Sequence, residues 1–185
     1  SEAEDLRRRI EEVARRVAEK LKKINRDTER IVRDVKKKLE EIHKRTEEVA
    51  EEVKEVLRRI KDKDTLRKVV EEVAEELRDL NRKLEEIIRR VADELRKLNE
   101  ELKRIVDEVV DELRKLIKEV VDRTGPGDEV EELRKTIEDI RRRLEEEVRR
   151  NHDEIRKAEE ELRELNRRNH ERIKEIKEEL DREVT

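Results

Sequence analysis

The sequence predicts an all-α fold: a straight antiparallel three-helix bundle in up-down-up order, with long, rod-like helices. Three observations lead to this prediction, namely the residue composition, two polar breaks in a helical pattern, and an eighteen-residue apolar repeat. Charged residues make up 58% of the 185-residue chain and hydrophobic residues 31%. Leu, Ile, Val, Glu, Lys and Arg dominate, as is typical of long helices and coiled coils.

Two short tracts divide the helical pattern into three segments. Residues 124–128 form the clearer break, because Gly125 can adopt the left-handed conformation that ends a helix and Pro126 cannot continue one. Residues 62–64 form the other break. The predicted helices therefore span about 2–61, 65–123 and 129–183, and we expect one three-helix domain over residues 1–185.

Each predicted helix starts near a residue that can cap it. Ser1 has the capping-box spacing with Glu4 at the start of the first helix. Asp64 or Asp62 is the candidate cap of the second helix, and Asp128, with a glutamate three residues later, is that of the third. Because both connections are short, neighbouring helices should run antiparallel.

The apolar positions of every predicted helix recur with an eighteen-residue period. One such register in the first helix holds Leu6, Ile24, Ile42 and Ile60. One period completes five turns of an undistorted α-helix, so the apolar stripe does not drift around the axis and no supercoil is required. Helices of this length should extend about 85 to 90 Å at 1.5 Å per residue.

Composition argues against several classes of function. A net charge of −4, with acidic and basic residues interspersed, gives no single-sign field for nucleic acid, and no aromatic residue is present to stack on bases. No apolar stretch approaches the roughly 20 residues that cross a bilayer. We therefore expect a soluble protein, cytoplasmic in a recombinant host, that has no targeting segment and does not bind membranes or nucleic acid.

Catalytic and metal sites are not predicted either. The chain has no cysteine, and its carboxylates lie on solvated helix faces where nothing raises their pKa. Glu40 and His43 have the Glu-x-x-His spacing of di-iron bundles. However, Glu40 lies off the apolar face and the spacing is not repeated on another helix. We therefore expect no enzyme, no metal, no cofactor and no small-molecule substrate.

Small polar residues interrupt the apolar registers at two depths. We paired helices one and two by residue numbers that sum to about 125, and helices two and three by numbers that sum to about 250. The interruptions then gather in two layers. The first layer contains Asn25, Thr28, Asn99, Asn151 and His152, and the second contains His43, Thr46, Asn81, Asn169 and His170, with Asn166 as a further candidate.

These layers are predicted to be buried hydrogen-bond networks that make the packing specific. A buried amide without partners costs about 1 to 3 kcal/mol, so a slipped register that faces these groups with apolar side chains is disfavoured. On this interpretation Asn99→Leu alone destabilises the protein by stranding its partners. Replacing the whole layer instead leaves stability equal or higher but loses uniqueness of packing.

With its eighteen-residue registers and matched Asn, Thr and His layers, the whole chain resembles parametrically generated de novo helical bundles with built-in hydrogen-bond networks. The resemblance implies a structural scaffold with no natural activity and no natural cellular location. Natural spectrin-type spacers and lipid-binding helical proteins are less similar, since both usually carry aromatic anchors.

Two alternatives remain open at this stage. Buried histidines suggest a pH switch, because protonation adds a charge that the network cannot match. A partner helix or a second copy could also complete a larger bundle. The apolar arc of the second helix spans about 140° at 100° per residue, whereas that of the third spans about 80 to 100°. A monomer requires no partner, and the exposure of secondary apolar positions distinguishes the two cases.

Overall fold

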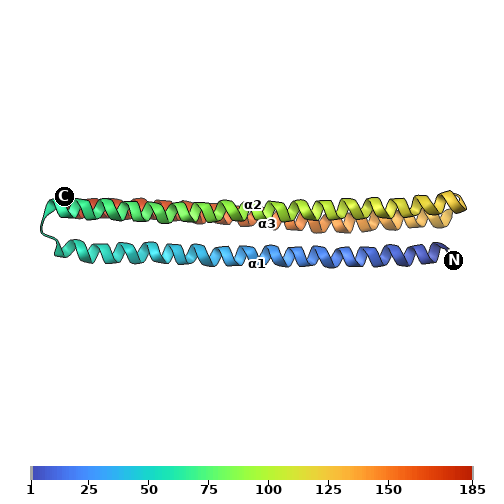
Figure 1. The fold of residues 1–185 in the computed structure, drawn as a ribbon, viewed down its shortest axis with the longest axis horizontal. Helices are drawn as coiled ribbons and strands as arrows, with labels where there is room; N and C mark the ends of the chain where they lie inside the picture. Colours follow the sequence, from blue (N-terminus) through green and yellow to red (C-terminus); the bar gives the residue numbers. More distant parts are fainter. Residues whose placement is uncertain (1, 185) are drawn as a thin grey trace. The chain divides into compact units, whose positions relative to one another are not determined.

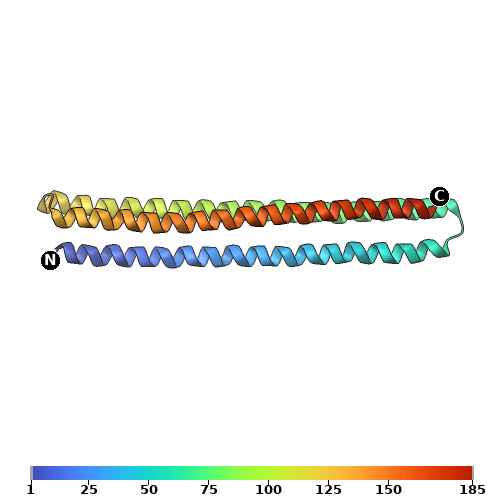
Figure 2. The same cartoon turned by 180° about the vertical axis from the view of Figure 1, so that it is seen from behind.

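The computed structural model describes residues 2–184, which form three helices joined by two short connections (Figures 1 and 2). Helix α1 spans Glu2–Arg59, α2 spans Lys63–Thr124 and α3 spans Asp128–Val184. No strand occurs in this described range. The predicted all-α class and three-helix arrangement are confirmed, with helix ends shifted by one or two residues. The predicted cap Ser1 lies outside the described residues.

The first connection shows which aspartate caps α2. The backbone carbonyl of Asp62 accepts from the N–H of Leu66 at 3.1 Å, and its side-chain Oδ2 accepts from the Thr65 hydroxyl at 2.8 Å. Backbone N–H groups of Asp64 and Thr65 also bond to the Asp62 carboxylate. Together these donors lower the pKa of Asp62, the Thr65 hydroxyl having the largest effect. Asp62 is therefore the N-cap, and α2 begins two residues earlier than predicted.

The second connection confirms the role of Gly125 and corrects that of Asp128. Gly125 has φ of 78° and donates its N–H to the carbonyl of Val121 at 2.8 Å, which is the left-handed end of a helix. Gly127, through its carbonyl, accepts from the N–H of Glu131 at 3.2 Å. Gly127 thus occupies the capping position, and Asp128 is the first helical residue, where its negative charge favours the helix N-terminus.

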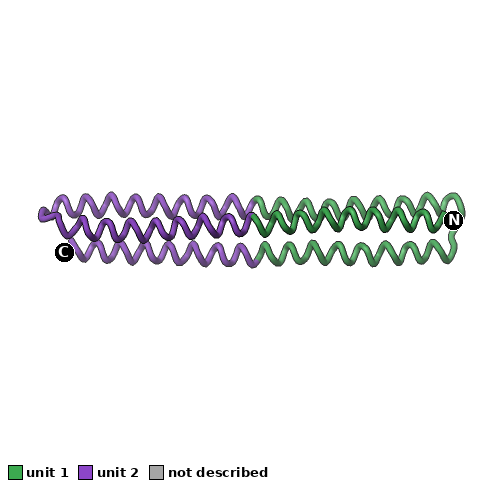
Figure 3. Tube along the Cα trace, turned by 90° about the horizontal axis from the view of Figure 1, so that it is seen from below, with its two compact units in different colours: residues 1–30, 94–156 green, residues 31–93, 157–185 purple. Residues whose placement is uncertain are grey.

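The chain divides into two compact units, which are described separately (Figure 3). Unit 1 contains residues 1–30 and 94–156, and unit 2 contains residues 31–93 and 157–185. Each unit takes a segment from all three helices. The single domain over 1–185 and the straightness of the whole chain stay predictions.

Within each unit the helices pack antiparallel in sequence order. In unit 1 Arg123 of α2 pairs with Glu2 of α1, and Arg114 of α2 pairs with Glu138 of α3. The residue numbers of these pairs sum to 125 and 252, close to the predicted 125 and 250. In unit 2 Lys54 of α1 pairs with Glu179 of α3, a constant offset of 125 that marks parallel helices.

Each unit has its own aliphatic core. The unit 1 cluster includes Ile10, Leu21, Leu102 and Leu113, and the unit 2 cluster includes Leu77 and Leu180. All six side chains are fully buried. Burial at intervals of three and four residues, repeated with the eighteen-residue period, is the arrangement that the apolar registers predict. Among the described residues Val56 is the exposed large hydrophobic one, at 47%.

Candidate functional site

The buried polar side chains of the described chain are those that interrupt the apolar registers. They are Thr28, Thr46, Asn81, Asn99, Asn151 and Asn169, none more than 8% exposed. Asn25 is half-buried, whereas His43, His152 and His170 are exposed residues. Six of the ten predicted positions are therefore buried, and the three histidines are placed differently from the prediction.

The polar layer of unit 1 centres on Asn151 of α3. Its amide nitrogen Nδ2 donates to Oδ1 of Asn25 at 2.6 Å and to Oγ1 of Thr28 at 3.1 Å, both on α1. The Thr28 hydroxyl in turn donates to the carbonyl of Ile24 at 3.0 Å. Nδ2 of Asn25 donates to the Glu147 carboxylate at 3.4 Å, so the group continues from a fully buried amide to a surface carboxylate.

Two predicted members of this layer stay outside it. No hydrogen bond within the described residues joins Asn99 or His152 to Asn151, Asn25 or Thr28. Asn99 is 7% exposed, and its Oδ1 is buried without a partner. The His152 side chain is 55% exposed and lies 4.0 Å from the Asp153 carboxylate. The cause is angular: residue 152 lies 100° around α3 from the buried Asn151, which turns its ring to the surface.

The polar residues of unit 2 form two separate pairs. Nδ1 of His43 on α1 lies 3.5 Å from Oδ1 of Asn169 on α3. Nδ2 of Asn81 on α2 lies 3.4 Å from Nδ1 of His170 on α3 and 3.2 Å from the Glu85 carboxylate.

Thr46 joins neither pair. Its hydroxyl donates to the carbonyl of Ile42 in its own helix at 2.9 Å. The single connected network that the sequence predicts for this layer is therefore not formed by direct bonds.

These contacts indicate which ring nitrogen carries the hydrogen, and the answer differs between His43 and His170. Oδ1 of Asn169 can only accept, so Nδ1 of His43 carries the hydrogen in their bond. Nδ2 of Asn81 is a donor, so Nδ1 of His170 accepts and its hydrogen is on Nε2. Both assignments follow from the amide orientations. The hydrogen bonds are part-buried, yet the histidine residues are exposed, which corrects the predicted burial of the rings.

Several buried amide atoms have no hydrogen-bond partner, which corrects the prediction of fully connected networks. They are the Oδ1 atoms of Asn81, Asn99, Asn151 and Asn166 and the Nδ2 atom of Asn169. An unsatisfied buried polar atom costs about 1 to 3 kcal/mol. These unpartnered atoms therefore do not stabilise the fold.

Ion pairs between α1 and α3 line the seam beside the unit 2 layer. Arg172 contacts Glu47 in a bidentate manner, through Nε at 2.6 Å and Nη2 at 3.0 Å, and Lys54 contacts Glu179 at 2.9 Å. The hydrogen bond from Arg172 lowers the pKa of Glu47, although partial burial opposes this change. Nothing singled out these pairs in the sequence, since similar charges occur along every helix.

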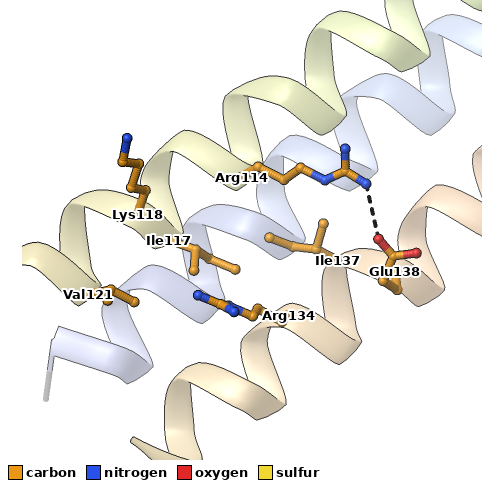
Figure 4. Close-up of a pocket in the computed structure, with 7 residues that line it drawn as sticks. All are labelled: Arg114, Ile117, Lys118, Val121, Arg134, Ile137 and Glu138. Carbon is orange, nitrogen blue, oxygen red and sulfur yellow. Dashed lines mark hydrogen bonds and ion pairs between the residues drawn. The ribbon is translucent and has the colours of Figure 1, made fainter. Parts of the chain in front are cut away.

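A surface groove runs between α2 and α3 in unit 1 (Figure 4). Ile117, Val121 and Ile137 form its apolar part, and the charged residues around it are Arg114, Lys118, Arg134 and Glu138. Arg114 donates to Glu138 at 3.2 Å, as the figure shows. Hydrogen bonds from Arg141 and Arg114 lower the pKa of Glu138, so this carboxylate is poorly suited to act as a general acid.

Two further findings limit the chemistry of the described residues. No group of three or more His, Asp or Glu side chains is arranged to hold a metal ion in residues 2–184. None of the helices in that range is long and apolar enough to cross a membrane.

The helices and their packing define a three-helix bundle. One solved structure described as a "Computationally designed three helix bundle" has the same fold, with a TM-score of 0.64 and 17% sequence identity. The alignment covers 99% of this chain and 92% of that chain. No protein-family model matches the sequence, and no curated protein matches it.

Proposed function

We propose that this chain is a designed structural scaffold, without catalytic activity or cofactor, in which buried polar side chains fix the register of the helices. The observation that carries the proposal is the repeated contact between α1 and α3. Asn151 meets Asn25 and Asn169 meets His43, each with an offset of 126 residues. The same relation occurs once in each unit, which indicates deliberate placement of the polar residues.

Polar residues are needed to fix the register because the apolar residues repeat along each helix. A segment shifted by one eighteen-residue period places aliphatic side chains against equivalent aliphatic side chains, so the core alone distinguishes poorly between the two registers. The polar residues distinguish the two registers. A shift of α1 by one period in one direction places Asn151 beside His43 and Thr46 and leaves Thr28 facing Leu133. A shift in the other direction places Asn151 beside Arg7 and Ile10 in place of Asn25 and Thr28. Its buried amide then loses the two bonds it makes in the described arrangement.

The fold comparison supports a designed origin, because the similar solved structure is itself described as computationally designed. The composition agrees with it, since the chain has no aromatic, cysteine or methionine residue. The charged residues serve as a solvated surface on this proposal. Their ion pairs are mostly between residues three or four apart in one helix, and such pairs contribute about 0.2 to 0.5 kcal/mol each.

Replacing the unit 1 layer with the residues found one period away tests the proposal. The changes are Thr28→Ile, Asn99→Ile and Asn151→Leu, which copy the equivalent residues Ile10, Ile117 and Leu133. We expect helicity to persist and resistance to denaturant to stay equal or increase. Amide nitrogen–proton spectra should nevertheless show several peaks for single residues of this unit, because alternative registers become populated.

The matched control carries three exposed changes, Lys22→Gln, Lys97→Gln and Arg142→Gln, and should keep one peak per residue. A triple layer variant that also keeps one peak per residue, with unchanged cooperativity of unfolding, contradicts the proposed role of the layer.

The contact of His43 argues against a pH switch at that residue, whereas a second proton on His170 would remove the Nδ1 acceptor of its bond to Asn81. In the His43 contact the bonded Nδ1 already carries its hydrogen, so a second proton on the exposed ring leaves the bond to Asn169 in place. Protonation of this ring therefore does not create the unmatched buried charge that a switch requires.

A further inference from the structure

We infer that the polar layer of unit 2 binds one buried water molecule that joins its three helices. The water accepts a hydrogen bond from Nδ2 of Asn169 on α3 and donates to Oδ1 of Asn81 on α2 and to Oγ1 of Thr46 on α1. These side chains are almost fully buried, at 2%, 8% and 0% exposure. Nδ2 of Asn169 and Oδ1 of Asn81 have no hydrogen-bond partner among the described residues.

Contacts between the helices place the three side chains at one depth. Nδ2 of Asn81 lies 3.4 Å from the ring of His170, which directly follows Asn169 in α3. Oδ1 of Asn169 lies 3.5 Å from the ring of His43, which lies one turn before Thr46 in α1. Asn169 is therefore level with Thr46 on one side and with Asn81 on the other.

The equivalent layer of unit 1 shows that Asn169 and Thr46 are neighbours. A shift of eighteen residues relates Asn151 to Asn169 and Thr28 to Thr46, so both pairs have the same offset of 123 residues between α1 and α3. Nδ2 of Asn151 donates directly to Oγ1 of Thr28 at 3.1 Å. The side chains of Asn169 and Thr46 therefore face each other across the same helix pair in unit 2.

His43 prevents Asn169 from making that direct bond. In unit 1 the corresponding residue is Asn25, whose Oδ1 accepts from Asn151 and so draws its Nδ2 toward α1. In unit 2 Nδ1 of His43 carries the hydrogen and donates to Oδ1 of Asn169. The Asn169 amide is therefore turned the other way, and its N–H donors are left inside the layer without an acceptor.

Asn81 provides a matching acceptor from α2. Its Nδ2 donates to the carboxylate of Glu85 at 3.2 Å and lies beside His170, and both of these residues have contact with solvent. Its Oδ1, on the other side of the same carbon, is buried. A buried water typically makes about three hydrogen bonds to polar groups that are otherwise unsatisfied, as these two groups are.

The third bond and the polarity of the site also agree with water. The Thr46 hydroxyl donates its hydrogen to the carbonyl of Ile42 at 2.9 Å, so its oxygen accepts further bonds. One N–H donor and two acceptor oxygens suit water, which both donates and accepts. In unit 1 the unpartnered buried side-chain atoms of the described residues are Oδ1 of Asn99 and Oδ1 of Asn151, so that layer offers no free donor.

The layer has more space than an aliphatic layer of the same backbone. Each of its three polar side chains is smaller than the aliphatic one found two periods away in the same register. Those aliphatic residues are Ile10, Ile117 and Leu133. A polar site with room is the setting in which a buried water is retained, whereas a dry cavity is apolar.

Nuclear magnetic resonance tests the inference on the intact chain. Magnetisation transfer from water to the side-chain N–H protons of Asn169 is recorded on nitrogen-15-labelled protein, because a water held in the core gives an Overhauser effect with the sign of a large molecule. Asn81→Leu removes one acceptor and fills the space. The control is Lys83→Gln, an exposed change two residues away on α2. Circular dichroism checks the helicity of both variants.

We expect this water signal at Asn169 in the unmodified chain and in Lys83→Gln, and its loss in Asn81→Leu. A signal that persists in Asn81→Leu, or that is missing from the unmodified chain, overturns the inference. A crystal structure of the unmodified chain gives a second test that needs no variant. It should show a water oxygen about 2.7 to 3.2 Å from Asn169 Nδ2, Asn81 Oδ1 and Thr46 Oγ1.

A direct bond from Asn169 to Asn81 or Thr46 in that crystal structure, with no water between the helices, overturns the inference. The bound water goes beyond the proposed scaffold function and does not rest on it. Loss of register specificity is measured in unit 1, so either proposal can fail while the other holds.

Discussion

Two asparagines of unit 1 provide a matched test of what the polar layer contributes to stability. Asn151 and Asn99 are both buried, at 0% and 7% exposure. Asn151 donates two hydrogen bonds to side chains of α1, whereas Asn99 makes no hydrogen bond within the described residues and has a buried, unpartnered Oδ1. Replacing each by leucine adds a similar apolar side chain, so the difference between the two variants isolates the hydrogen bonds of Asn151.

The expected changes in the free energy of unfolding follow from the hydrogen bonds of the two asparagines. Asn99→Leu removes an unsatisfied buried oxygen and should raise the free energy of unfolding by about 1 to 2 kcal/mol. This expectation reverses the one drawn from the sequence, where Asn99 was given partners. Asn151→Leu loses two bonds of about 1 kcal/mol each, so it should be less stable than Asn99→Leu by about 2 kcal/mol.

Denaturant unfolding followed by far-ultraviolet circular dichroism measures both variants against the unmodified chain. The slope of each transition shows whether the comparison is valid, because equal slopes indicate equal exposure of surface on unfolding. Variants that agree within about 0.5 kcal/mol refute the view that the bonds of Asn151 stabilise the described register. A destabilised Asn99→Leu variant refutes the assignment of Asn99 as an unpartnered residue.

Four further substitutions test one ion pair and the helix ends. Glu47→Gln should cost about 1 kcal/mol at neutral pH, by removing the bidentate contact with Arg172. Because the pKa of Glu47 is lowered in the folded state, its contribution is present above the unfolded pKa and is lost as pH falls through the folded one. Denaturant midpoints from about pH 7 to about pH 3 should therefore fall more steeply for the unmodified chain than for Glu47→Gln. Gly125→Ala should lower the melting temperature by an amount equivalent to about 1 kcal/mol, since φ is 78° there, whereas Gly127→Ser should raise it slightly. Asp62→Ala should lower the melting temperature in the same experiment, because it removes the side-chain cap of α2, and an unchanged value contradicts that capping role.

The sequence predicted the helices and their register because both depend on periodic features. Thr28, Asn151 and Asn169 are buried as predicted, since each replaces an aliphatic residue in the middle of an apolar register. The pairing of α1 with α2 followed from a short connection, and Arg123 with Glu2 confirms it.

The direction of individual side chains and the exact helix ends were not predicted from the sequence, because they depend on single contacts and not on the apolar period. Alignment of His152 with His170 shows that the two are equivalent but leaves open whether either faces inward. Both follow a buried asparagine directly and are turned 100° from it, toward solvent. Asp62 and Asp64 both follow a lysine in the same polar tract, so the sequence left two candidate caps for α2. The hydroxyl of Thr65 resolves the choice structurally, by donating to Asp62.

The two exposed histidine rings of unit 2 also allow nuclear magnetic resonance to follow helix alignment in this bundle without a chemically attached probe. His43 bears its hydrogen on Nδ1 because of Asn169 on α3, and His170 bears its hydrogen on Nε2 because of Asn81 on α2. Nitrogen-15 shifts of an imidazole differ strongly between these two tautomers. One isotope-labelled amino acid therefore reports the alignment of α1 with α3 and of α2 with α3 as two separate signals. A sliding helix becomes visible as a change of tautomer at one named ring.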